Sequence, residues 1–199
     1  LALRLGLKRK VLVRKEFDES LAALRELPGI IQSILNERSG FIHRVAHNYA
    51  KIKNWLYLGR GIYYPVALES ALKMKEVAYV HAEGMSGGFL KHGTLAMVDD
   101  EVNTIVFTPP CGDKELYEAT LRSVEEIRAR SGFVFGIHFN EKGRNKGLFN
   151  EELILPNVSP LVAPLIQLVI GQLFAYFTAI SLKRNIDKPR SLAKSVTVG

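Results

Sequence analysis

Short apolar runs alternate with longer segments of helical periodicity through most of this 199-residue chain. Trp55-Leu56-Tyr57-Leu58 continues through a Gly59-Arg60-Gly61 turn into a helical stretch from about Tyr64 to Tyr79, which is how a βαβ unit begins. Four more runs of strand length follow, at about residues 80–85, 103–108, 133–139 and 152–155, and helical segments such as Lys114–Ser131 separate several of them. This order predicts an α/β fold with three α-β-α layers around a doubly wound, parallel, five-stranded sheet.

The first 50 residues are helical in character. From Phe17 to about Tyr49, apolar side chains recur at spacings of three and four, and Pro28 and the Ser39-Gly40 pair predict that this stretch is divided into separate helices. We expect a helical segment over residues 1–50 that leads into a domain over residues 51–183, followed by a tail over residues 184–199. Because the chain does not begin with Met, we expect it to be a piece of a longer protein.

The composition is that of a globular protein with an excess of positive charge. With 47% hydrophobic residues the chain is apolar enough for a core, and 27 Lys and Arg against 20 Asp and Glu give a net charge of +7. Nucleic acid, an anionic membrane surface or an anionic small molecule would each suit this charge. No helix–turn–helix or aromatic-basic platform supports nucleic acid as a partner. The single cysteine, Cys111, forms no internal disulfide and is typical of the reducing cytoplasm, where we expect the protein.

One uncharged stretch, Leu161–Leu182, is about 33 Å long as a helix, which is enough to span a bilayer. Pro164, Gln167 and Gly171 lie within it, and no second candidate span exists in the sequence. A helix that is apolar all round is also typical of the centre of a soluble α/β protein or of a subunit interface. We therefore expect a buried helix and no membrane association.

Metal and cofactor sites have little support in the sequence. His43 and His47 lie four residues apart on a helix, but no carboxylate is placed to complete a zinc site and their neighbours are polar. Neither of the two glycine-rich nucleotide-binding motifs is present. We expect no metal and no cofactor.

Three ionisable residues share one face of the predicted helix over residues 64–79. Glu69, Lys73 and Glu76 stand at positions i, i+4 and i+7. By spacing alone, a solvated face with an ion pair explains them. The rest of the helix is apolar, however, which favours a cleft in which a carboxylate base beside an ammonium group removes a proton next to a carbonyl.

Two further segments carry groups with chemistry. Four glycines fall in the ten residues that end at Gly93, and His92 beside them can carry a proton near neutral pH, although an ordinary surface histidine is the alternative. In the tail, Lys194 can act as an amine nucleophile if a cleft closes over it; disorder is the alternative there. Because ligands of open α/β sheets bind at the carboxyl ends of the strands, we expect all of these groups near that edge.

Three stretches of the sequence are specific enough to be recognised. They are the helix ALESALKMKEVAYVHAE (Ala67–Glu83), the loop end LKHG (Leu90–Gly93) and the tail DKPRSLAKSVTV (Asp187–Val198). The chain resembles the glutamine–fructose-6-phosphate aminotransferase, or glucosamine-6-phosphate synthase, family from about Leu1 to its end. It looks like the second of the two sugar-isomerase (SIS) domains of that family, which implies a flavodoxin-like topology.

The resemblance implies roles on the helix and in the loop. Glu76 matches the carboxylate that moves a proton between C1 and C2 during aldose–ketose isomerisation, and Lys73 matches a lysine that assists this step. Glu69 matches another acidic residue of the site. His92 matches a histidine implicated in opening the sugar ring, which in the family reaches the site from the neighbouring subunit.

The tail completes the implied site. Lys194 matches the lysine that forms a Schiff base with fructose 6-phosphate, and Ala193 lies in the segment that closes over the sugar. Two residues near His92 depart from the family pattern: Phe89 stands where Glu is usual, and Thr94 where Pro is common. The local contacts of His92 are therefore expected to differ from those of the family.

Other parts of the family are missing from the chain. A first SIS domain grips the sugar phosphate with a Ser/Thr-rich loop, and a glutaminase domain releases ammonia from glutamine. With those parts, the resemblance implies synthesis of glucosamine 6-phosphate from fructose 6-phosphate and glutamine by a homodimer; the present chain alone is expected to be inactive. The alternative is a non-catalytic SIS module that binds a sugar phosphate and regulates a partner.

Overall fold

A five-stranded parallel sheet forms the centre of the computed structural model, which describes residues 1–110, 112–139 and 147–190. The strand order is β2-β1-β3-β4-β5, and every neighbouring pair is parallel. This is the order of flavodoxin-like sheets, so the predicted fold class is confirmed. The strands are β1 (Asn54–Gly59), β2 (His81–Ser86), β3 (Val102–Phe107), β4 (Phe133–Phe139) and β5 (Glu151–Leu155).

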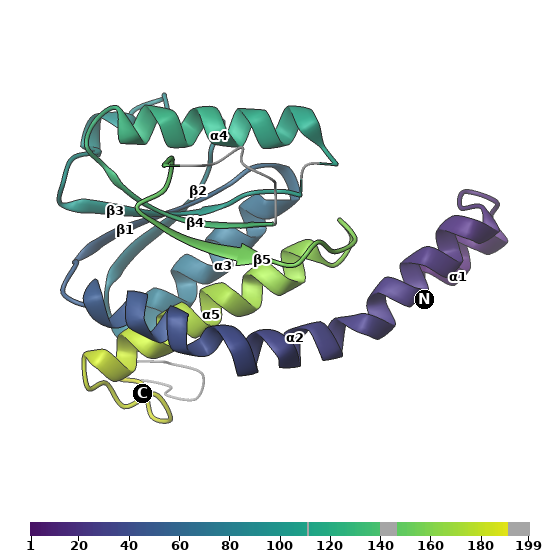
Figure 1. Cartoon of the computed structure of the whole chain (residues 1–199), viewed down its shortest axis with the longest axis horizontal. Helices are drawn as coiled ribbons and strands as arrows, with labels where there is room; N and C mark the ends of the chain where they lie inside the picture. The colour runs from purple at the N-terminus through teal and green to yellow at the C-terminus, as the bar shows by residue number, and fades with distance from the viewer. Residues whose placement is uncertain (111, 140–146, 191–199) are drawn as a thin grey trace, which may run out of the picture.

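Helices cover both faces of the sheet, as Figure 1 shows. The helices are α1 (Ala2–Lys8), α2 (Arg14–Asn48), η1 (Gly61–Tyr63), α3 (Tyr64–Lys73), η2 (Met74–Ala78), η3 (Thr94–Met97), α4 (Lys114–Arg128) and α5 (Ala163–Ser181). One face of the sheet carries α4, and the other carries α3, α5 and the C-terminal half of α2.

The two faces of each strand bury different sets of side chains. On β1, Trp55 and Tyr57 join the core beneath α2, α3 and α5, while Leu56 and Leu58 join the core beneath α4. This follows from the period of two along a strand. The inner strands β1, β3 and β4 are buried on both faces and are mostly apolar, which is why short apolar runs located them. The edge strands β2 and β5 expose one face, and polar residues such as Glu83 and Glu152 lie on it.

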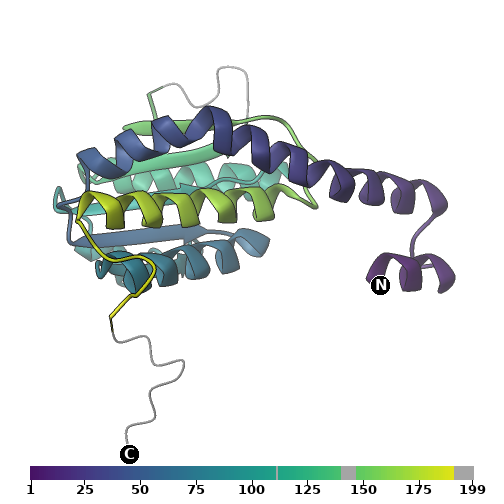
Figure 2. The same cartoon turned by 90° about the horizontal axis from the view of Figure 1, so that it is seen from below.

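The long uncharged stretch forms a core helix. α5 lies between α2 and α3 (Figure 2) and buries Ile166, Ile170 and Phe174 against the sheet. Among the described residues it is the one helix long and apolar enough to cross a membrane, and 56% of that apolar window is buried inside the domain. A Cβ added at Gly171 would overlap the Ser70 side chain, so α5 packs directly on α3. The expectation of a buried helix is confirmed.

The expected division of the N-terminal segment is wrong, because α2 runs without a break over Arg14–Asn48. Proline inside a helix usually costs about 3 kcal/mol, since it removes one hydrogen bond. Pro28 itself is exposed, so its ring displaces no core side chain. The N-terminal end of α2 projects from the domain with α1 (Figures 1 and 2). Past Ser39-Gly40, burial of side chains such as Ile42 and Val45 offsets the low helix propensity of glycine. The predicted domain limits at residues 50 and 183 stay a prediction.

Candidate functional site

The three ionisable residues of α3 and η2 form one hydrogen-bonded cluster. Lys73 Nζ lies 2.7 Å from Glu76 Oε2 and 3.3 Å from Glu69 Oε1. The three side chains keep 25–39% of their surface exposed. They therefore stand between core and solvent, where a ligand can reach them while other parts of their surface are covered.

A wide helical turn shapes the cluster. The predicted helix ends near Tyr79 as expected, but its last turn, η2, is a π-helix that begins directly after Lys73. π-Turns inserted in α-helices are rare and are frequent at functional sites. Here the wide turn carries Glu76, which contacts Lys73 three residues before it. Periodicity could not reveal this turn, because apolar spacing does not distinguish one π-turn from an α-turn.

The two carboxylates of the cluster favour the charged form of Lys73. The hydrogen bond from Lys73 to Glu76 holds the pKa of Lys73 above its ordinary value, and Glu69 acts in the same direction. Lys73 is therefore a cation at neutral pH and not an amine nucleophile. A cation held between two carboxylates can stabilise negative charge that develops on a neighbouring oxygen. A carboxylate that keeps free oxygen lone pairs can accept a proton from carbon.

His92 lies at the other end of the domain. α3 leads from the carboxyl end of β1 back to the amino end of β2, so Lys73 and Glu76 approach the amino edge of the sheet. His92 follows the carboxyl end of β2, is exposed, and has its ring 5.9 Å from the ring of Phe89. The expectation that all these groups gather at the carboxyl edge is therefore wrong. A crossover helix antiparallel to the strands carries its last residues away from that edge.

The carboxyl edge itself is closed by protein contacts. The Gly59–Gly61 turn and the glycine-rich loop that follows β2 meet there, with Gly87 N–H donating to Gly59 O at 3.0 Å. Arg60 Nη2 donates to Gly87 O at 2.7 Å and to Ser123 Oγ at 2.9 Å. Burial, followed by the nearby Arg122, lowers the pKa of Arg60. The sequence reasoning singled out the glycines and missed Arg60, whose partner Ser123 comes from α4, far along the chain.

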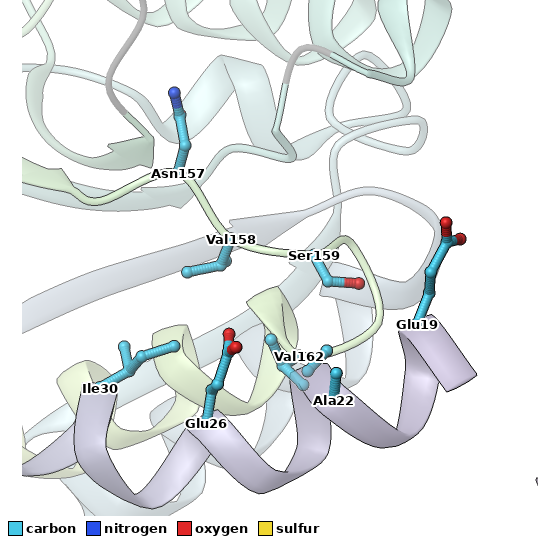
Figure 3. A pocket seen from close by; sticks show the side chains of 9 residues that line it. Glu19, Ala22, Glu26, Ile30, Asn157, Val158, Ser159 and Val162 are labelled. Atoms are coloured by element: carbon cyan, nitrogen blue, oxygen red, sulfur yellow. The ribbon is translucent and has the colours of Figure 1, made fainter. Parts of the chain in front are cut away.

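A pocket between α2 and the loop before α5 contains none of the predicted site residues (Figure 3). Ile30, Val158 and Val162 give it an apolar wall, and Glu19 and Glu26 add two carboxylates. Carboxylates repel a phosphate ester. This pocket is therefore a poor site for an anionic sugar.

Some predicted residues lie outside the described part of the chain. They are Lys194 and Ala193 of the tail, and Cys111. Within the described ranges, no group of three His, Cys, Asp or Glu residues is placed to hold a metal ion. The His43 and His47 rings lie 6.4 Å apart, and the His43 ring lies 4.9 Å from Phe177.

Comparison with known proteins identifies the centre of the chain. The family profile described as "SIS domain" matches residues 48–137, from the end of α2 into β4. This part of the chain is a SIS domain. The match covers the cluster on α3 and η2, the loop that carries His92, and four strands of the sheet.

The similarity to curated relatives extends well beyond the SIS profile. The chain is 39% identical over 198 residues to glutamine–fructose-6-phosphate aminotransferase (isomerizing) of Methanosarcina acetivorans, and 40% identical over 195 residues to the enzyme of the same name from Methanococcus maripaludis. These alignments cover 100% and 98% of the chain but 31% of each relative. The chain thus spans about a third of the length of the relatives it matches, and the resemblance seen in its motifs is confirmed.

A solved structure supports the same assignment. The C-terminal domain of glucosamine-fructose-6-phosphate aminotransferase from Francisella tularensis superimposes with a TM-score of 0.85 at 28% sequence identity. The superposition covers 94% of this chain and 52% of that one. The SIS domain described here therefore corresponds to about half of that C-terminal domain.

Proposed function

We propose that this SIS domain performs the sugar isomerisation of a glutamine–fructose-6-phosphate aminotransferase that makes glucosamine 6-phosphate. The observation that carries the proposal is the cluster of Glu69, Lys73 and Glu76 at the end of α3. The names of the relatives support the substrate class, since they specify fructose 6-phosphate and an isomerising reaction. The chain spans about a third of those relatives, so the complete reaction belongs to a longer protein.

In this proposal Glu76 is the base that transfers a proton between C1 and C2 of the sugar. When a proton is removed next to a carbonyl, the C–H electron pair forms a C=C bond and negative charge develops on the carbonyl oxygen. Next to an imine, the C=N electron pair moves to the nitrogen in the same way. The Lys73 ammonium, 2.7 Å from Glu76, is placed to stabilise that charge. Glu69, 3.3 Å from the same ammonium group, makes a second ion pair that helps to hold Lys73 in place.

Lys194 of the tail supplies the amine. Its nitrogen attacks C2 of fructose 6-phosphate, and the carbonyl oxygen leaves as water, so that a C=N bond replaces the C=O bond. Ammonia from glutamine then displaces the lysine amine. Ala193 closes over the sugar beside it. The raised pKa of Lys73 supports Lys194, and not Lys73, as the nucleophile, because a lysine held as a cation is unsuited to nucleophilic attack.

His92 opens the sugar ring from a second subunit of a homodimer. Its distance along the fold from Glu76, at the opposite edge of the sheet, supports a contribution to a different site from that of its own chain. The first SIS domain grips the phosphate, and the glutaminase domain supplies ammonia. The contacts of Arg60 support a phosphate grip from outside this domain. Its guanidinium already donates to Gly87 O and Ser123 Oγ, so these hydrogen bonds hold it at the carboxyl edge and away from a phosphate. We place the enzyme in the cytoplasm, without nucleic acid or membrane as partners.

Glu76→Gln in the full-length enzyme tests the proposal. The amide keeps the size of the carboxylate but cannot accept the proton, so glucosamine 6-phosphate formation should fall by about 10²–10⁴-fold while glutamine hydrolysis persists. Glu125→Gln, an exposed glutamate on α4, is the matched control and should leave both activities unchanged. If Glu76→Gln and Lys194→Ala both retained full amino-sugar synthesis, the non-catalytic regulatory module would be the better description.

A further inference from the structure

The segment that follows α5 contacts the side chain of Tyr79. The Arg190 backbone N–H donates to Tyr79 Oη at 2.7 Å, a contact between residues 111 positions apart. The guanidinium carbon of Arg190 lies 4.4 Å from the centre of the Tyr79 ring, and that of Arg184 lies 5.5 Å from it. Both distances are within the range of cation–π attraction. The Tyr79 side chain therefore accepts one hydrogen bond from residues 184–190 and makes cation–π contacts with two of their arginines.

Tyr79 also has an unusual backbone. Its φ of 60° and ψ of 34° lie in the left-handed region, where a side chain crowds the following carbonyl and Gly or Asn is preferred. Left-handed aromatic residues are uncommon and mark places where the surroundings hold the residue. The conformation ends η2, the π-turn that carries Glu76. Tyr79 thus adopts a backbone conformation that would cost glycine less free energy, and it does so where the C-terminal tail contacts η2.

The position of Tyr79 links two parts of the proposed site. Tyr79 follows Glu76 by three residues, so a shift of this side chain moves the end of the π-turn. On the tail, Lys194 follows Arg190 by four residues, and chain connectivity limits the distance between their α-carbons to about 14 Å in any conformation. Holding Arg190 on Tyr79 therefore limits how far Lys194 can move from the point where the tail meets the end of η2.

We propose that Tyr79 is the anchor of the C-terminal tail: its hydroxyl and ring hold residues 184–190 and position the tail relative to the end of η2. Tyr79 is a positioning residue and takes no part in proton transfer or in the covalent step. The anchoring stands on the contacts alone, whereas its effect on turnover rests on the proposed function.

Trypsin cleavage of the full-length enzyme measures the anchoring without using activity. The bonds after Arg184 and Arg190 are the reporters, since Lys188 precedes Pro189 and is a poor site. Tyr79→Leu removes the hydroxyl and the ring and should speed cleavage by about tenfold. Tyr79→Phe keeps the ring and should fall between Leu and the native enzyme. Tyr64→Leu, at the opposite end of α3, is the matched control and should leave cleavage unchanged.

A second variant separates loss of the anchor from loss of folding. Glycine suits a positive φ, so Tyr79→Gly should melt at the same temperature as the native enzyme or higher, and yet expose the tail to trypsin as Tyr79→Leu does. A stable variant with a released tail would show that the side chain holds the tail. Unchanged cleavage in both the Leu and Gly variants would overturn the anchor.

Turnover then tests the positioning role. We expect Tyr79→Leu to lower kcat for glucosamine 6-phosphate formation with little change in glutamine hydrolysis, and Tyr79→Phe to restore part of it. Faster cleavage with an unchanged kcat would overturn positioning. The proposed function has its own readout in Glu76→Gln, which does not touch the tail contacts, so failure of one proposal is distinguishable from failure of the other.

Discussion

Charged residues near the two ends of α3 make different kinds of contact. At its start, the carboxyl edge of the sheet is closed: Arg60 is partly buried and its hydrogen bonds go to Gly87 O and Ser123 Oγ. At its far end, Lys73 and its two glutamates are partly exposed, and their hydrogen bonds go to one another. The first arrangement joins loops, whereas the second keeps three charged groups together and accessible. In the proposed function, the ligand site therefore lies at the opposite end of this helix from the end that the general rule for doubly wound sheets favours.

A complementation experiment makes the strongest test of this contrast. Glu76→Gln and His92→Ala, each alone in the full-length enzyme, should lower glucosamine 6-phosphate synthesis by about 10²–10⁴-fold. If each site combines Glu76 of one subunit with His92 of the other, a mixed dimer has one intact site. Mixing the two inactive variants should then restore about a quarter of native activity, as expected for random pairing in a twofold-symmetric dimer. No recovery on mixing, with mixed dimers verified, would place both residues in the same subunit's site.

The packing of α3 on the sheet predicts the next largest effect. A Cβ at Gly84 of β2 would lie 2.5 Å from Leu68 Cα and 2.7 Å from Ala67 O, so Gly84→Ala must push α3 outward. We expect a loss of about 2–4 kcal/mol in unfolding free energy, measured by chemical denaturation. Gly29→Ala is the matched control, because nothing lies within 4 Å of its added Cβ and the residue is inside α2. That change should stabilise the protein by about 0.5–1 kcal/mol. Equal effects would mean that α3 is not tightly seated on β2.

A substitution at Arg60 tests whether this residue stabilises the fold without taking part in catalysis. Arg60→Met keeps most of the side-chain length but loses the hydrogen bonds to Gly87 O and Ser123 Oγ, and should cost about 1–3 kcal/mol of stability. Below the melting temperature, turnover per folded molecule should stay close to native. The checks are a thermal melt and a steady-state assay on the same preparation. A stable variant with lost turnover would move the active groups back to the carboxyl edge.

Lys73 should show the reverse behaviour. Lys73→Met removes two partly exposed ion pairs, each of which contributes little, so stability should change by about 1–2 kcal/mol or less while amino-sugar synthesis falls. Because the folded-state pKa of Lys73 is raised above its ordinary value of 10.5, its contribution to stability is fully present below about that pH and is lost as the pH rises through the folded pKa. The stability difference between native and Lys73→Met proteins should thus be flat from pH 6 to 9 and shrink only in strong alkali. A difference that shrinks near pH 7 would contradict the raised pKa.

Much of the fold could be predicted from local patterns. Five short runs located the five strands, and the inner strands β1, β3 and β4 stood out because strands buried on both faces have little polar sequence. Periodicity failed where neighbouring elements decide the outcome. α2 crosses Pro28 and Gly40 because its C-terminal half packs on the core, and the last turn of α3 widens into η2 without any mark in the apolar spacing. Local propensity alone does not contain such contacts.

The candidate site divides in the same way. By itself the sequence determined which groups are candidates for the chemistry: two carboxylates and a lysine at helical spacing, a histidine in a glycine-rich loop, and a lysine in a distinctive tail. Only the tertiary structure decided where they stand. It put Lys73 and Glu76 at the amino edge, left His92 at the carboxyl edge, and brought Arg190 to Tyr79. The reason is physical, because spacing along a chain fixes neighbours within one helix, whereas contacts between distant segments depend on how the helices and strands pack.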